Sequence, residues 1–327
     1  MKCINRYIAL ILICIISISF CACDSNNIKT YKLENTSAQY GLVNTIADEN
    51  IEFFGSDKCV TSNDNFGLNL VDSHVAQGGG VFNLSTHEVT YGQNLFGKMY
   101  PASTTKILTA LVAIENADLN QMITVSEYAA DQSSDSSVAN LKAGDVMSLK
   151  DLLYGLMLRS GNDAAIAIAE GVAGDEEHFA ELMNKKAREF GATHSHFITP
   201  HGLHKDDHYT TIYDMYLIFS AAIKNETFLS IISTEEYSPI YTGIDGTEKT
   251  QTWYNTNQYL LGKSKAPEGF TVIGGKTGTT YEAGYCLVLY SKNSAGEDII
   301  SIVYNADCAL NLYYLTNQLL YTFGDTE

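Results

Sequence analysis

The feature that most constrains this chain is an apolar stretch, Tyr100–Ile114 (YPASTTKILTALVAI), which carries a serine and a lysine near its start. The stretch predicts a buried helix, and Pro101 suits the first helical position because its missing N–H would be unpaired there anyway. In a helix, Ser103 and Lys106 project to neighbouring points about one turn apart. A fold built around this helix therefore has to bury a hydroxyl and an amine side by side.

This pair has the chemistry of a nucleophile and its base. A serine hydroxyl attacks poorly unless a neighbour accepts its proton, and a lysine can do so only when it is neutral. The ordinary pKa of lysine is ~10.4, so burial or a second positive charge has to lower it. The apolar residues Ile107–Ile114 predict that Lys106 is buried. Alone, however, the S-x-x-K spacing is a pattern that a chain of 327 residues can carry by chance.

Two further polar motifs follow along the chain. Ser160-Gly161-Asn162 lies in a tight link between two apolar helices, and its simplest interpretation is a helix–helix turn with Asp163 as the next N-cap. Gly274–Thr280 (GGKTGTT) follows the predicted strand FTVI, and its simplest interpretation is a glycine-rich turn. Glycine in a strand also permits the close approach of another backbone, so a substrate could lie there as an added strand.

Taken together, the motifs S-x-x-K, S-x-N and K-T-G resemble those of the serine penicillin-recognising enzymes. Longer segments resemble the low-molecular-mass D-alanyl-D-alanine carboxypeptidases, namely PASTTKILTA, LMLRSGNDAA, TPHGL, HYTTIYDM and GGKTGTTYEAGYCLV. The resemblance runs from about residue 70 to the C-terminus. It implies an α+β, β-lactamase/transpeptidase-like fold, in which an antiparallel sheet is flanked by helices and carries an inserted all-helical region. It implies no metal and no cofactor.

The resemblance also implies a role for each residue of the site. Ser103 would attack the penultimate D-Ala carbonyl of a peptidoglycan pentapeptide stem, with Lys106 as its base and Ser160 passing a proton to the leaving D-Ala. The backbone N–H groups of Ser103 and Thr279 would hold the oxyanion. Penicillins and other β-lactam antibiotics mimic the terminal dipeptide and should acylate the serine. The implied substrate-binding residues are Asn162, which would also orient the lysine, Lys276, Thr277, Gly278 and Thr279.

The N-terminus has the pattern of an export signal. Lys2 and Arg6 precede the apolar run Ile8–Phe20, and a small residue stands immediately before Cys23. This ending is similar to a bacterial lipobox. We therefore expect a lipoprotein-type signal peptide over residues 1–22, lipidation of Cys23, and a domain held at the extracytoplasmic face of the cell membrane. An uncleaved signal anchor is the alternative.

After the signal we expect a tether over residues 23–40 and a catalytic domain over 41–327. The sheet region should cover about 70–100 and 236–327, and the helical region about 101–235. The pattern of residues 41–75 is weak and fits either a tether or part of the sheet. The predicted strands are 80–84 and 88–91, which form a hairpin, then 270–273, 285–290 and 299–304. One predicted helix begins at Ala102 and a second at Leu149, and a third, AAIAIAE, ends at Gly171. The remaining predicted helices cover 175–190, 213–223 and 311–323. The last of these should pack on the sheet.

Composition and motifs argue against several other functions. The formal net charge is −18 and the pI about 4.7, so nucleic acid would repel the chain. Outside the leader only Cys59, Cys286 and Cys308 remain, which gives neither a disulfide framework nor a C-x-x-C metal motif. Five histidines lie between His194 and His208, which suggests zinc, but this loop-like region lacks an H-E-x-x-H motif. We expect His201 and His208, which belong to TPHGL and HYTT, to make structural hydrogen bonds.

Two other hypotheses for the function of the serine site remain. A serine β-lactamase needs a carboxylate that activates the deacylating water, and none of the acidic residues after Ser160 lies in a suitable loop pattern. A penicillin or peptidoglycan sensor would bind without turnover, and intact motifs do not exclude a stable acyl-enzyme. The sequence also leaves open whether the acyl group passes to water or to an amine, and which third residue the stem peptide carries.

Overall fold

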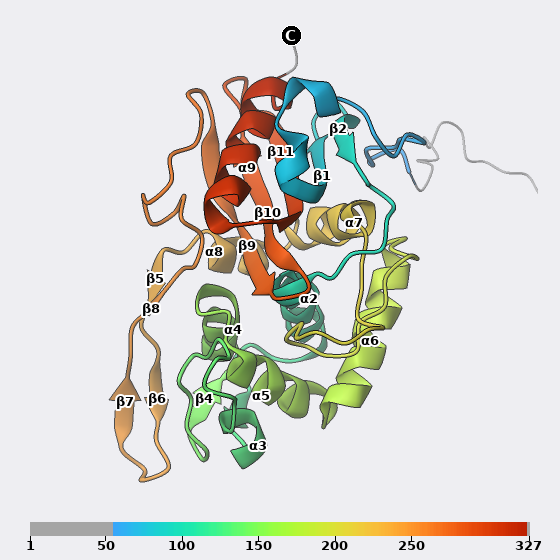
Figure 1. The fold of residues 1–327 in the computed structure, drawn as a ribbon. Helices are drawn as coiled ribbons and strands as arrows, with labels where there is room; N and C mark the ends of the chain where they lie inside the picture. The colour runs from blue at the N-terminus through green and yellow to red at the C-terminus, as the bar shows by residue number, and fades with distance from the viewer. Residues whose placement is uncertain (1–54, 326–327) are drawn as a thin grey trace, which may run out of the picture. The chain divides into compact units, whose positions relative to one another are not determined.

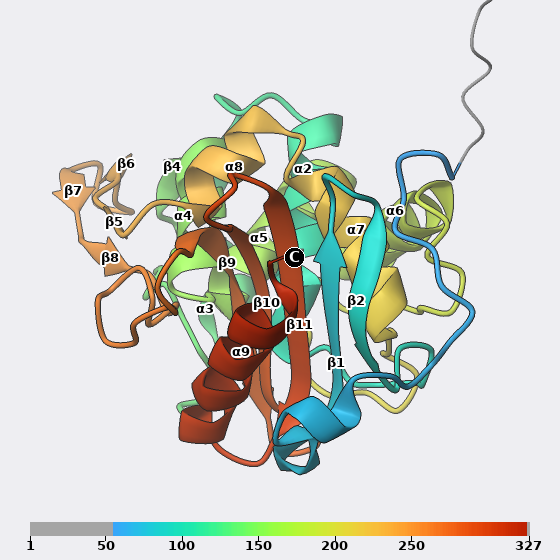
Figure 2. The same cartoon turned by 90° about the horizontal axis from the view of Figure 1, so that it is seen from above.

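The computed structural model describes residues 55–325. The expected signal peptide, the lipidation site Cys23 and the tether lie outside the described residues. Within the described part, the helices and strands form an antiparallel sheet with helices on both of its faces, as Figures 1 and 2 show. The expected α+β class is therefore confirmed.

The main sheet joins two segments that are far apart in the chain. Its five strands lie in the order β2-β1-β11-β10-β9, and all neighbours are antiparallel. The predicted hairpin pairs with the C-terminal strands through β1 and β11, where Gly80 lies opposite Ile302. The bounds are β1 Ala76–Asn83, β2 Glu88–Gln93, β9 Thr271–Thr280, β10 Gly284–Lys292 and β11 Asp298–Ala306.

Strand β9 is longer than predicted. We expected the strand to end at Ile273, but it continues through the K-T-G motif to Thr280, paired with β10 along this length. Glycines make this possible, since a Cβ atom at Gly275 would lie 2.2 Å from the carbonyl oxygen of Val288. The glycine-rich turn is therefore the wrong interpretation. Since β9 is the last strand of the sheet, its outer edge has no partner strand in the described structure.

Two hydrophobic clusters hold the helices on the sheet. Helix α9 (Ala309–Phe323) covers one face and buries Leu315 and Leu319 against β1 and β11, as predicted for core packing. Helices α7 (Ile212–Ala222) and α8 (Glu226–Ile232) lie on the opposite face. Figure 2 shows the sheet between α9 and these two helices.

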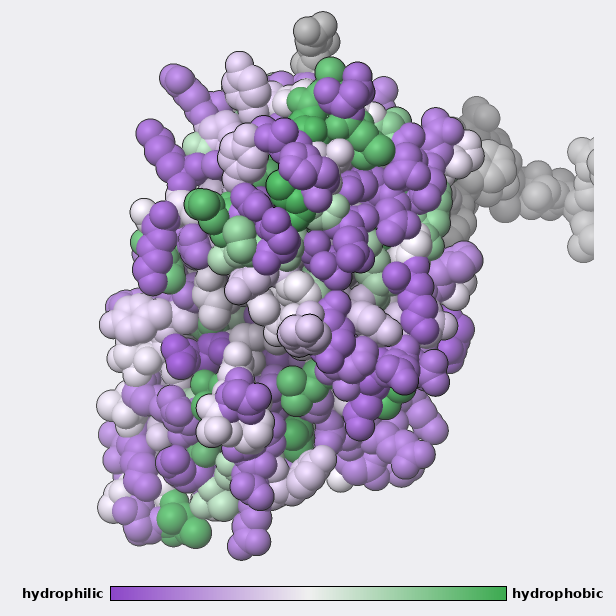
Figure 3. All heavy atoms as spheres, viewed as in Figure 1, coloured by the Kyte–Doolittle hydropathy of each residue, from purple (hydrophilic) through white to green (hydrophobic). Residues whose placement is uncertain are grey.

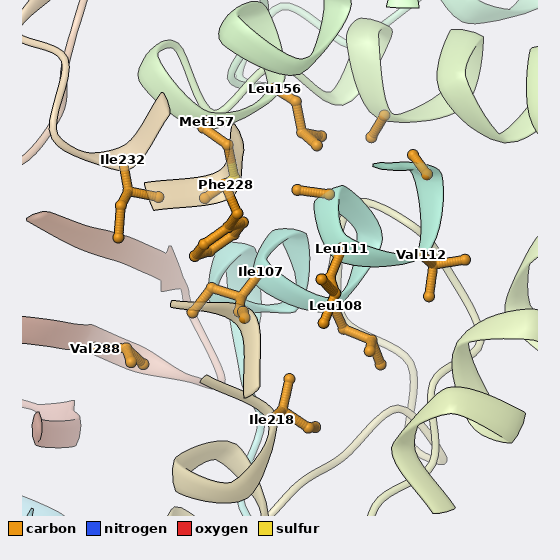
Figure 4. Packing of buried hydrophobic residues seen from close by; sticks show 14 of the residues in the cluster. Ile107, Leu108, Leu111, Val112, Leu156, Met157, Ile218, Phe228, Ile232 and Val288 are labelled. Atoms are coloured by element: carbon orange, nitrogen blue, oxygen red, sulfur yellow. The ribbon is translucent and has the colours of Figure 1, made fainter. Parts of the chain in front are cut away.

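Helix α2 (Lys106–Asn116) is the centre of the helical region and is buried from Lys106 to Ala113. Ile107, Leu108 and Leu111 belong to one large cluster with Leu156 and Phe228 from other helices, as Figure 4 shows. The surrounding helices are α3 Glu127–Ala130, α4 Leu149–Leu158, α5 Asn162–Ala173 and α6 Glu176–Glu189. The predicted burial of this helix is confirmed.

Local signals placed several helix ends well, but they misplaced the start of α2, which is Lys106, and the end of α5. Helix α4 begins after Ser148, whose hydroxyl accepts a hydrogen bond from Asp151 N at 3.1 Å, as the capping pattern predicted. The predicted end of α5 at Gly171 is wrong, because the helix continues to Ala173 and Gly174 follows with φ of 91°. Gly171 instead makes room for Ile123, whose Cδ1 would lie 2.6 Å from an added Cβ.

Short strands modify the expected division into a sheet region and a helical region. Within residues 101–235, β3 and β4 pair with each other, and β4 pairs with β6. The segment from residue 236 therefore adds first to the helical region and joins the main sheet only at Thr271. These strands are β3 Met122–Thr124, β4 Val146–Ser148, β5 Glu236–Tyr237, β6 Ile240–Thr242, β7 Glu248–Thr250 and β8 Trp253–Tyr254.

The weakly patterned segment before β1 packs on the domain from residue 59 onward. Cys59 N donates to the Tyr216 hydroxyl at 2.7 Å, and Phe66 forms a β-bridge with Gly92 of β2. Two 3-10 turns follow, Leu68–Leu70 and Ser73–Val75. This part of the chain is therefore structured rather than a tether.

The face of the molecule in Figure 3 is mainly polar. Figure 3 shows a largely hydrophilic face with small, separate hydrophobic patches. Within residues 55–325 no single helix is long and apolar enough to cross a bilayer. The pair α7 and α8, bent by 110°, is long and apolar enough only when the two helices are counted together. Most of the residues of both helices are buried or half-buried in the domain.

Candidate active site

The site begins at the turn that leads into α2. Ser103 lies in a 3-10 turn (Ala102–Thr105), and Lys106 is the first residue of the α-helix, so the predicted helix start at Ala102 is a tighter turn. Ala102 has φ of 46°, an uncommon value for a residue with a side chain. Such backbone strain persists where surrounding structure enforces it. Here the turn packs closely against Gly278 of β9 on one side and against Gly202 of a neighbouring loop on the other.

Lys106 is buried and has three polar neighbours. Its Nζ lies 3.0 Å from Ser103 Oγ, 2.7 Å from Asn162 Oδ1 and 2.7 Å from the carbonyl oxygen of His201. A neutral amine has two N–H groups and one lone pair. If the two N–H groups donate to Asn162 and His201, which can only accept through these oxygens, the lone pair points to the serine hydroxyl.

The surroundings of Lys106 favour the neutral amine. Burial lowers its pKa well below the ordinary value, and the positive charge of Lys276 lowers it further. Asp163 acts in the opposite sense but is the weaker influence. Burial and a second cation are the two conditions that allow a lysine to serve as a base at neutral pH.

Ser160 and Lys276 form a second hydroxyl–amine pair. Lys276 Nζ lies 3.0 Å from Ser160 Oγ and 2.9 Å from the carbonyl oxygen of Thr277. Ser160 has φ of 58°, a left-handed conformation at the link between α4 and α5. Burial lowers the pKa of Lys276 to about 7. The expected helix–helix turn is present, but its serine also contacts a lysine from the main sheet. The expected N-cap is wrong, because Gly161 caps α5 and Asp163 lies inside the first turn of the helix.

Asn162 and Asp163 begin α5 and hold the neighbouring loop. Asn162 accepts from Lys106 through Oδ1 and donates through Nδ2 to Ser136 Oγ at 2.6 Å. Asp163 accepts backbone hydrogen bonds from Ala139, at 2.8 Å, and Leu141, at 3.0 Å. No sequence motif pointed to Ser136, because its contact with Asn162 depends on how the loop folds back.

Strand β9 brings the K-T-G residues beside the serine. A Cβ atom at Gly278 would lie 3.0 Å from Ser103 N, so only glycine lets this strand approach so closely. Thr277 Oγ1 lies 2.7 Å from Thr256 Oγ1, a contact that sequence reasoning missed, and Thr279 Oγ1 donates to the Gly278 carbonyl at 2.8 Å. All the predicted site residues within the described range are thus gathered in one place.

The histidine-rich loop makes structural contacts. His208 Nδ1 accepts from Ile198 N at 3.1 Å, and its Nε2 lies 2.9 Å from Thr105 Oγ1. Burial lowers the pKa of His208 to about 3, so this ring is neutral. In residues 55–325, no group of three His, Cys, Asp or Glu side chains is placed to hold a metal ion.

A serine–lysine pair at the start of a central helix, an S-x-N link and a K-T-G edge strand together define the serine penicillin-recognising enzymes. Comparison with known proteins narrows the class: the chain belongs to the D-alanyl-D-alanine carboxypeptidase family of serine peptidases, whose sequence profile matches residues 71–308. This match favours a peptidase over the β-lactamase and the sensor.

Individual relatives agree with this family. The chain is 35% identical over 240 residues to D-alanyl-D-alanine carboxypeptidase DacF of Bacillus subtilis, which covers 72% of this chain and 58% of that protein. It is 37% identical over 218 residues to DacC of Escherichia coli, covering 64% and 51%. The crystal structure of a Streptomyces DD-transpeptidase superposes with a TM-score of 0.70 at 31% identity, covering 76% of this chain and 96% of that one. The chain thus spans little more than half the length of these two carboxypeptidases.

Proposed function

We propose that this protein is a serine-type D-alanyl-D-alanine carboxypeptidase that removes the terminal D-Ala from peptidoglycan stem peptides and is acylated by penicillin. The observation that carries the proposal is the buried Lys106 amine, 3.0 Å from the Ser103 hydroxyl. The family of the chain and the names of its relatives support the substrate.

In the proposed reaction Ser103 Oγ attacks the carbonyl carbon of the penultimate D-Ala while Lys106 Nζ takes the hydroxyl proton. The oxyanion would be held by the backbone N–H groups of Ser103 and Thr279. The close approach of Gly278, the neighbour of Thr279, to Ser103 N supports this assignment. The C–N bond then breaks, and the leaving amine takes a proton through Ser160. Water hydrolyses the resulting ester and restores the serine.

The substrate carboxylate would bind at the second amine. Lys276 offers a positive charge and the next residue, Thr277, offers a hydroxyl, both on β9, whose outer edge has no partner strand in the described structure. Gly278 follows these residues along β9 and approaches Ser103 N, so a peptide added along this edge would have its carboxylate at Lys276 and Thr277 and its scissile carbonyl near the serine. Asn162, which already holds Lys106, would bind the substrate amide.

The direct test measures release of D-alanine from diacetyl-Lys-D-Ala-D-Ala. We expect release by the wild-type protein and none by Ser103→Ala or by a penicillin-blocked sample. Ser62→Ala, which removes an exposed serine hydroxyl from the segment before β1, serves as the matched control and should leave release unchanged. If penicillin still labels Ser103 but no D-alanine is released, the proposed carboxypeptidase activity would be wrong. The protein would then be a sensor or a peptidase of different specificity.

Transfer to an amine is a second candidate, because a structural relative is named a DD-transpeptidase. The same acyl-enzyme would then be attacked by an amino group instead of water. Adding glycylglycine to the assay and analysing the products by mass spectrometry separates the two. A transfer product that exceeds the hydrolysed product would assign the protein to transpeptidation.

The pH dependence of acylation follows from the two lysines. Lys106 has to be neutral to accept the proton, so acylation should weaken as falling pH protonates it. Lys276 has to be charged to bind the penicillin carboxylate, and since its pKa is about 7, acylation should also weaken as pH rises through that value. We expect the second-order rate constant to pass through a maximum and to fall as pH rises through about 7. A rate constant that stays unchanged as pH rises through this value would contradict the role of Lys276.

We also propose that the protein is exported and anchored by a lipid at Cys23. The support is the sequence pattern alone, with Lys2 and Arg6 before an apolar run that ends near this cysteine. Mass spectrometry of the protein from bacterial membranes is the test. An intact N-terminus without lipid would overturn the anchor.

A further inference from the structure

The carbonyl that holds Lys106 belongs to a buried histidine in a tightly supported loop. Gly202 N donates to Thr199 Oγ1 at 3.2 Å, and Thr109 Oγ1 donates to the Pro200 carbonyl at 2.6 Å. Between them, the His201 carbonyl lies 2.7 Å from Lys106 Nζ. The position of this carbonyl therefore depends on how the His201 turn is held.

The ring of His201 takes part in holding its own turn. Leu203 N donates to His201 Nδ1 at 3.0 Å, so Nδ1 carries a lone pair and the ring proton of the neutral imidazole lies on Nε2. Burial lowers the pKa of His201 below its ordinary value, which agrees with a neutral ring. The Nε2–H tautomer is thus required by the turn.

Glu176 faces the protonated nitrogen of this ring. It is the first residue of α6, and its Oε1 accepts from the Tyr128 hydroxyl at 2.9 Å. Its Oε2 lies 3.4 Å from His201 Nε2, and this shielded oxygen makes no hydrogen bond within the described residues, so the Nε2–H group is the donor that faces it. Although burial acts to raise the pKa of Glu176, His201 and Tyr128 outweigh it and hold the pKa below its ordinary value. The carboxylate is therefore ionised.

We propose that Glu176 is a positioning residue for Lys106: its carboxylate holds His201 in the Nε2–H tautomer, and this tautomer keeps the His201 carbonyl on the lysine. The role of Lys106 rests on the proposed function, whereas the contact between Glu176 and His201 does not. The three residues come from α6, the loop after it and α2.

The physical reason is a conflict that the other tautomer would create. With the proton on Nδ1, two N–H groups would face each other at Leu203 and the turn would have to open. The carbonyl would then move, and Lys106 would keep only Asn162 to direct its N–H groups. Loss of one hydrogen bond of this kind corresponds to about a tenfold change in rate. The lone pair would no longer be aimed at Ser103.

Two measurements on Glu176→Ala, Glu176→Gln and the matched control Glu177→Ala test the proposal. Glu177 is exposed and adjoins Glu176 in the first turn of α6. The first measurement is the rate constant of acylation by a fluorescent penicillin. The second is the tautomer of His201, read from the nitrogen-15 chemical shifts of its ring and assigned with a His201→Gln sample.

We expect Glu176→Ala to lower acylation about tenfold and to populate the Nδ1–H tautomer of His201. Glu176→Gln keeps an acceptor oxygen and should recover most of both properties, and Glu177→Ala should match the wild type. An unchanged His201 tautomer in Glu176→Ala would overturn the proposal even if acylation fell, since only stability would then be affected. Wild-type protein that penicillin does not acylate would instead overturn the proposed function, and the tautomer comparison would still decide whether Glu176 holds His201.

Discussion

Replacing Lys106 by alanine should lower the rate constant of acylation by penicillin about a thousandfold or more, the scale of a lost general base. The Lys106 amine, 3.0 Å from the Ser103 hydroxyl, is the group placed to take its proton. Alanine at this position removes that acceptor. The fold should remain, since removing a buried amine also removes the cost of its burial. Stopped-flow measurement of acylation, with a thermal melt of the same sample, checks both parts.

Lys185→Ala is the matched control, because Lys185 is an exposed lysine on the surface of α6. It should leave acylation at the wild-type rate. Rapid labelling of Lys106→Ala by penicillin would rule out Lys106 as the base. A large drop in its melting temperature would instead show that the lysine is needed for the fold itself.

Replacing Gly202 by alanine should destabilise the protein by about 3 kcal/mol and also slow acylation. Gly202 has φ of 85°, a conformation that residues with a Cβ atom seldom adopt. An added Cβ would also lie 1.9 Å from the carbonyl oxygen of Ala102 and 2.6 Å from Thr105 Oγ1. The loop therefore has to move away from the serine turn, and the His201 carbonyl moves with it. Urea denaturation and the acylation rate measure the two effects.

The matched control is Gly246→Ala. Gly246 also has a positive φ, 74°, but an added Cβ would meet no atom within 4 Å. This substitution should therefore lower the free energy of unfolding only through backbone strain, by about 1 kcal/mol, and should leave acylation unchanged. Equal losses of stability in the two variants would show that contact with Ala102 contributes nothing.

The elements that sequence reasoning placed well are those governed by neighbouring residues. The cap at Ser148 and the hairpin of β1 and β2 depend on side chains and turns only a few positions apart. The end of α5 and the length of β9 depended instead on distant partners, Ile123 for Gly171 and the whole of β10 for the K-T-G motif. A local pattern does not contain those partners.

The supporting contacts of the site were the least predictable part. Ser136, Thr256 and Glu176 each touch a site residue or its support, yet none of them lies in a motif that the sequence singled out. Their residue types are common on protein surfaces. Only the fold distinguishes them from other serines, threonines and glutamates of the chain.

The sequence by itself determined that Ser103 and Lys106 are neighbours, because helical geometry brings residues three positions apart to the same side. It also determined which polar groups were available to join them. The tertiary structure alone decided that the pKa of Lys106 is lowered and that its amine lies against the Ser103 hydroxyl. The acceptors that orient it lie 56 and 95 positions away along the chain, and the burial that lowers its pKa comes from packing between the sheet and several helices. Distance along the chain carries no information about such contacts, because they form only when the domain closes around the amine.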